Sequence, residues 1–202
     1  MRLFSTAFVA AILLCGSFSA MAQDTIKAED VPKNAEVMIL DNPYKEQIRT
    51  QAEKLANSFD EAEAQNFILL NQGFGFIRSI TIAKDSVADA VKACRKNNPE
   101  MADDIKDRFK TWDDEIDSAL KIQRKNYKEA LDKPHFNNPK DVKSYLDLVD
   151  KAAKHAEDNI DKRIVTDKVA CEKLLNSMDE TQSVILQSLN TLQWPQVSSE
   201  AE

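Results

Sequence analysis

Turn-forming residues are scarce in this chain of 202 residues, which contains only three glycines and six prolines. A β-rich fold needs a tight turn after each short strand, and glycine and proline are the residues that most often supply those turns. Two of the three glycines, Gly73 and Gly75, also fall within a single apolar stretch instead of between elements. The composition therefore argues strongly against a β-rich fold and favours long helices.

The motifs that identify common enzyme classes are also absent. The sequence has no nucleophile elbow, zinc-protease motif or phosphate-binding loop, and only two histidines, His135 and His155. It lacks the paired Glu-x-x-His motifs of di-metal bundles and the Cys-x-x-Cys-His motif of covalent haem. The acidic run from Asp113 to Asp117 lacks the glycine of a calcium loop and is more typical of a solvated helix face. We predict a protein without catalytic activity, metal or cofactor.

Acidic side chains outnumber basic ones by 34 to 27, which gives a formal net charge of −7. Arg2 is the only charge in the first 22 residues, so the chain from Gln23 onward has 26 basic and 34 acidic residues, or −8. Nucleic acids and anionic membrane surfaces both attract basic patches. The charge balance therefore argues against either partner.

The first 22 residues have the pattern of a cleaved secretory signal peptide. Arg2 supplies a positive start, residues 7–14 form a short apolar core, and Ala20-Met21-Ala22 offers a cleavage site. The apolar core is shorter than the roughly 20 residues that cross a bilayer. A lipid anchor at Cys15 is disfavoured by the bulky Leu14 before it. The sequence contains no Asn-x-Ser/Thr glycosylation site, so nothing points to a eukaryotic secretory route. We therefore expect a soluble protein of the bacterial periplasm.

Two cysteines remain once Cys15 is removed with the leader, namely Cys94 and Cys171. In an oxidising compartment two cysteines can form one disulfide. Metal ligation is the weaker interpretation, because neither cysteine has a second cysteine or a histidine nearby. A bond between them would close a loop of about 76 residues.

Helix starts are marked by asparagine–proline pairs, because asparagine is a good N-cap and proline suits the first helical position. A fourth start is expected at Thr166, with Asp167 in the first turn. Ser58 and Glu61 fit a capping box, which predicts a break near residues 57–60. The three pairs are Asn42-Pro43, Asn98-Pro99 and Asn138-Pro139.

Apolar residues recur at steps of three and four from residue 43 to residue 192, which is the pattern of amphipathic helices. Short connections predict an all-α, antiparallel up-down-up-down bundle with an extra N-terminal helix, spanning residues 42–194. In that topology Cys94 and Cys171 lie at the same pole, on first and fourth helices that are neighbours in a ring. Residues 23–41 form an N-terminal arm with one apolar run at 37–40, and residues 195–202 form a disordered tail.

The stretch from Phe67 to Ile82 is the most apolar part of the chain after the leader, and other helices must cover it. Gly73 and Gly75 each cost up to about 1 kcal/mol in a helix interior. Three explanations stay open: close approach of a neighbouring helix or of Trp112, a kink in the helix, or a ligand against the exposed backbone.

Arg78 is the only formal charge in that stretch. A guanidinium in apolar surroundings needs water or a carboxylate partner. Residue counting from the cysteine pole places it level with residues 113–117 and near Asp147 or Asp150. It is either half of a structural ion pair or an anchor for an acidic ligand.

The sequence leads to two functional hypotheses. The first is an exported, non-catalytic helical bundle that binds another macromolecule of the envelope, such as an envelope protein. The second is a carrier that holds an apolar or haem-like small molecule in the bundle core around residues 67–82. The candidate ligand-binding residues are Gly73, Gly75, Arg78 and Trp112.

Overall fold

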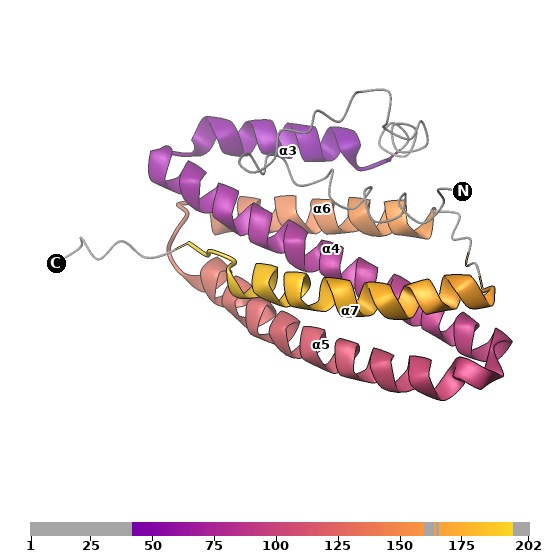
Figure 1. Cartoon of the computed structure of the whole chain (residues 1–202). Helices are drawn as coiled ribbons and strands as arrows, with labels where there is room; N and C mark the ends of the chain where they lie inside the picture. The colour runs from indigo at the N-terminus through magenta and orange to yellow at the C-terminus, as the bar shows by residue number, and fades with distance from the viewer. Residues whose placement is uncertain (1–41, 160–163, 165, 196–202) are drawn as a thin grey trace, which may run out of the picture.

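The computed structural model describes residues 42–159, 164 and 166–195. The predicted leader, arm and most of the tail, residues 196–202, lie outside the described residues. Throughout those ranges the regular structure is helical, and no strand is present (Figure 1). The elements are α3 (Lys45–Ser58), α4 (Glu61–Asn97), the short 3-10 helix η2 (Pro99–Met101), α5 (Ala102–Asp132), α6 (Pro139–Asp158) and α7 (Lys168–Asn190).

Successive helices run in opposite directions, which confirms the all-α, up-down-up-down bundle with an extra N-terminal helix, α3 (Figure 1). The longest helix, α4, lies at the centre and packs on α5, α6 and α7. As expected for the first and fourth long helices, α4 and α7 are neighbours. The arrangement departs from the predicted four-membered ring at α6, which packs mainly on α3 and α4. Helices α5 and α7 pack directly on each other. The apolar stripe of α3 needs a partner, and α6 supplies it.

The core draws large side chains from every described α-helix. Each fully buried leucine or isoleucine contributes about 1.5–3 kcal/mol relative to an exposed one. None of the described helices is long and apolar enough to cross a membrane. The largest fully buried apolar side chains of the helices are Leu55, Leu70, Ile105, Ile116, Leu120, Val142, Met178 and Leu189.

The break between α3 and α4 lies where the sequence predicts it, but the capping box is formed by a different pair of residues. Asp60 accepts a hydrogen bond from the Glu63 backbone N–H at 2.8 Å, and the Glu63 carboxylate accepts one from the Asp60 N–H at 3.2 Å. The predicted Ser58–Glu61 pair is therefore wrong. Ser58 still belongs to α3, where its hydroxyl donates to the Leu55 carbonyl at 3.0 Å.

The prolines of two asparagine–proline pairs occupy first helical positions, in η2 and α6, but their asparagines form no side-chain cap. The α7 cap is Asp167, not Thr166, and its side chain accepts from the Ala170 N–H at 2.9 Å. Asn98 instead donates its side-chain amide to the Thr166 carbonyl at 3.0 Å. That hydrogen bond ties the end of α4 to the start of α7.

Cys94 and Cys171 form the predicted disulfide, with Cα atoms 5.7 Å apart. Both cysteines are buried, and they join the C-terminal end of α4 to the first turn of α7. The two residues are separated by 77 positions in the sequence. The bond therefore fixes one pole of the bundle.

Replacing both cysteines, Cys94→Ala with Cys171→Ala, should lower the free energy of unfolding by about 4 kcal/mol, because the loop closed in the unfolded chain is long. Urea melts of the variant and of the wild type, oxidised and reduced, measure this difference. Reduced wild type should melt like the variant. Two reactive thiols in the unreduced, unfolded wild type would contradict the assignment.

Candidate functional site

The predicted apolar stretch, residues 67–82, lies in α4 and is covered on three sides. Its aromatic rings meet partners on two other helices, with Phe74 5.4 Å from Tyr127 of α5 and Phe67 5.2 Å from Tyr145 of α6. The third side faces α7 and the chain that follows it. The protein's own side chains therefore occupy most of the space around this stretch.

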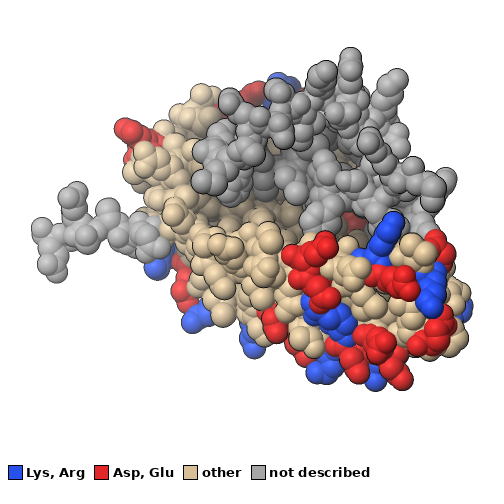
Figure 2. All heavy atoms as spheres, viewed as in Figure 1, with Lys and Arg blue, Asp and Glu red and all other residues tan. Residues whose placement is uncertain are grey.

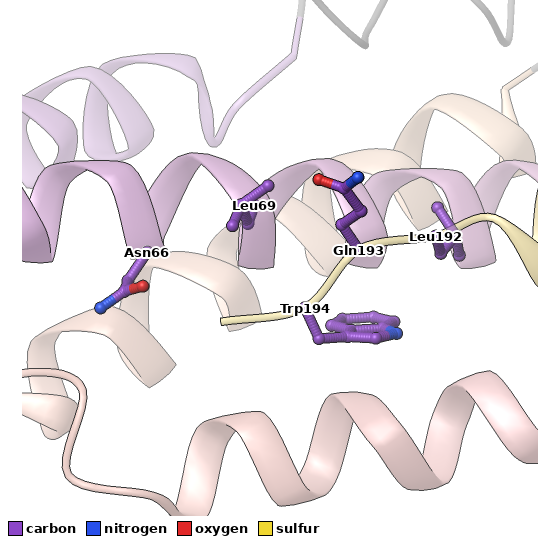
Figure 3. Close-up of a pocket in the computed structure, with 5 residues that line it drawn as sticks. All are labelled: Asn66, Leu69, Leu192, Gln193 and Trp194. Carbon is purple, nitrogen blue, oxygen red and sulfur yellow. The ribbon is translucent and has the colours of Figure 1, made fainter. Parts of the chain in front are cut away.

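Close packing explains Gly73. The side chain that packs against it is Trp194, whereas the sequence suggested a neighbouring helix or Trp112. A Cβ atom added at Gly73 would lie only 2.6 Å from the indole Cη2 of Trp194. The indole Nε1 donates to Gln123 Oε1 of α5 at 2.9 Å. After α7 ends, the chain continues between α4 and α5, and the missing side chain of Gly73 makes room for the ring (Figure 3).

Gly75 and Trp112 lie elsewhere. Gly75 lies two residues after Gly73, so it faces a direction about 200° around α4 from Gly73, because each residue of an α-helix turns by about 100°. Trp112 is 2% exposed and stacks on Phe109, with ring centroids 6.2 Å apart. The four candidate ligand residues therefore do not converge on a common site.

Arg78 has the carboxylate partners that a structural role requires. Its guanidinium lies 3.0 Å from Asp150 and 3.5 Å from Glu157, both on α6, and its side chain is 21% exposed. Asp150 was one of the expected partners. A role in anchoring a ligand stays a prediction.

The carboxylates near residue 113 pair with a different cation. Lys84 of α4 lies 2.9 Å from Asp113 and 3.2 Å from Asp117. Burial, with Asp147 and Asp150 nearby, raises the pKa of Tyr127 to about 12. The Tyr127 phenol is therefore neutral at pH 7.

His135 lies in the loop between α5 and α6, and it is 7% exposed. Burial lowers the pKa of its imidazole, and Lys133 lowers that pKa further. The loop is held by buried Glu63, whose carboxylate accepts the Asn137 N–H. Across the described ranges no group of three or more His, Cys, Asp or Glu side chains is arranged to hold a metal ion.

The feature that sequence reasoning missed is an uncharged surface formed by α4 and the end of α7. Residues 64–77 and 181–195 contain no charged residue, although 30% of the chain is charged. Figure 2 shows a continuous area without Lys, Arg, Asp or Glu on this side, whereas charged side chains crowd the opposite end. We define the uncharged surface by Asn66, Ile68, Leu69, Val184, Leu192 and Gln193.

Two large apolar side chains are well exposed on the uncharged surface. Ile68 is 53% exposed and Val184 is 60% exposed. An open pocket of about 460 Å³ lies between α4 and the chain that follows α7 (Figure 3). Its lining consists of Asn66, Leu69, Leu192, Gln193 and Trp194.

Comparison of the chain with models of protein families, with curated proteins and with solved structures found no match.

The Gly73–Trp194 contact predicts a strong dependence between the two positions. Gly73→Leu should lower the free energy of unfolding by about 1–3 kcal/mol, because the new side chain collides with the indole ring. The same change should cost much less in a Trp194→Ala background, where the ring is gone. A double-mutant cycle by urea melts measures the coupling. An equal cost in both backgrounds would contradict the packing explanation.

Proposed function

We propose that this protein is an exported, non-catalytic helical bundle that binds another protein of the bacterial envelope through its uncharged surface. Export is supported by the signal-peptide pattern of residues 1–22. The partner chemistry is supported by the exposure of Ile68 and Val184, which lie in two stretches of the chain without charged residues. That exposure is the observation that carries the proposal.

The composition of the uncharged surface suits a protein partner. Interface centres are depleted in charged residues, because a charge buried without a partner is costly, and contiguous apolar patches often mark binding sites. Asn66 and Gln193 at the pocket can donate and accept hydrogen bonds, while Leu69 and Leu192 supply apolar contact. We expect a partner segment with one or two apolar side chains flanked by uncharged polar groups.

A small-molecule carrier is the alternative. Trp194 occupies the space over Gly73, so a ligand within the bundle would have to displace a ring hydrogen-bonded to Gln123. The open pocket beside Trp194 offers a route to that position without opening the helices. A bound ligand would therefore add mass to the purified protein and change the environment of Trp194.

The test uses three proteins: the wild type, the double variant Ile68→Glu/Val184→Glu, and Ile122→Glu. Ile122 is 56% exposed on α5, so its replacement adds one negative charge away from the uncharged surface, against two in the double variant. All three should keep similar urea melts, because each altered side chain is exposed. Cross-linking in cells, followed by mass spectrometry, should recover a partner with the wild type and the Ile122→Glu control but not with the double variant.

Equal recovery from the double variant and the Ile122→Glu control would contradict binding through the uncharged surface. Native mass spectrometry of the same preparations distinguishes a protein-binding bundle from a small-molecule carrier. A small molecule bound to wild-type protein, with no partner cross-linked, would favour the carrier.

A further inference from the structure

A stripe of small and apolar residues continues from Ile68 along α4, on the side directed away from α5, as far as Asp89. Its residues follow steps of three and four, and three α4 residues that contact other elements point to other sides of the helix. Lys84 faces α5, Gly73 faces Trp194 and Arg78 faces α6. We call this the outer face of α4 and define it by Gly75, Ser79, Ile82, Ala83, Ser86 and Ala90.

The composition of the outer face is unlike that of a solvated helix face. The chain is 30% charged, yet these positions carry small or apolar residues only. Its largest side chain, Ile82, is only half-buried. Small residues let another backbone approach closely, and an apolar face is normally covered by a second element.

Helix α6 borders the outer face and ends well before α4 does. The two helices run side by side in the same direction, as the Phe67–Tyr145 and Arg78–Asp150 contacts show. Beyond Arg78, α4 continues for 19 residues, whereas α6 continues for 8 residues beyond Asp150. At 1.5 Å per residue, α4 therefore extends about 16 Å further than α6.

The described chain begins beside this region. Asn42 donates its side-chain amide to the Ala152 carbonyl of α6 at 2.9 Å, and Tyr44 packs edge-on against His155. The apolar run 37–40 lies two to five residues before Asn42. Five extended residues reach about 17 Å, which exceeds the 10–12 Å diameter of the helix they must pass.

We propose that the segment Val37-Met38-Ile39-Leu40 docks on the outer face of α4 and holds the N-terminal arm against the bundle. An extended segment turns alternate side chains to one side, so two of the four apolar side chains can pack among Ser79, Ile82 and Ser86. The docking site adjoins the uncharged surface, because Ile68 lies on the same stripe of α4, but the docking does not require the proposed partner.

Site-specific photo-cross-linking of the full chain tests the docking. A benzoylphenylalanine probe replaces Met38, and a control probe replaces Ala28, which lies outside the apolar run. The Met38 probe should react within one chain with the tryptic peptides 79–84 and 85–92, and the control should not. Reaction between two chains would assign the outer face to a second copy. Equal reaction by both probes, reaction elsewhere, or no reaction would overturn the proposal.

A variant with a charge on the outer face, compared with one that has a charge on α5, gives a second test of the docking. Ile82→Glu should lower the yield of the Met38 cross-link by about tenfold, which corresponds to a docking equilibrium weakened by about 1.4 kcal/mol. Ile122→Glu on α5 should leave the yield unchanged. If Ile82→Glu does not fold, Ser86→Glu replaces it, because serine makes a smaller contribution to packing. A yield unaffected by the charge would overturn the proposal.

Discussion

The burial of an uncharged stretch of α4 is the constraint on which the rest of the bundle depends. Residues 64–77 contain no charge, and α4 is the one described helix that packs on α5, α6 and α7 together. Even so, helices alone do not fill the space over Gly73. The chain that continues beyond α7 places Trp194 there, because glycine leaves room for the ring.

The polar contacts of the bundle act mainly at its margins and its two ends. At one end the disulfide and the Asn98–Thr166 hydrogen bond join α4 to α7. At the other end buried Glu63 caps α4 and holds the α5–α6 loop. Arg78 and Lys84 pair with acids on neighbouring helices at partly exposed positions, where such pairs add little free energy.

Local patterns predicted the helices and the break near residue 58, because periodicity and proline position are encoded within a few residues. The cysteine pair added one long-range constraint, and it was enough to order the poles. Periodicity could not identify the neighbour of each face, so the pairing of α3 with α6 was missed. The contact between Gly73 and Trp194 was missed for the same reason, since Trp194 looked only like the end of a helix. The uncharged surface could have been noticed by comparing residues 64–77 with residues 181–195, but nothing in the sequence shows that these stretches lie side by side.

The central claim is that α4 is the common core element and that α3 and α6 form an outer pair on it. Native-state hydrogen exchange in increasing urea tests this most directly, since it gives an opening free energy for each amide. The account predicts that amides at residues 70–80 exchange only through global unfolding, while amides in α3 and α6 exchange through a smaller opening of lower free energy. Lower opening free energies at residues 70–80 than in α3 and α6 would contradict it.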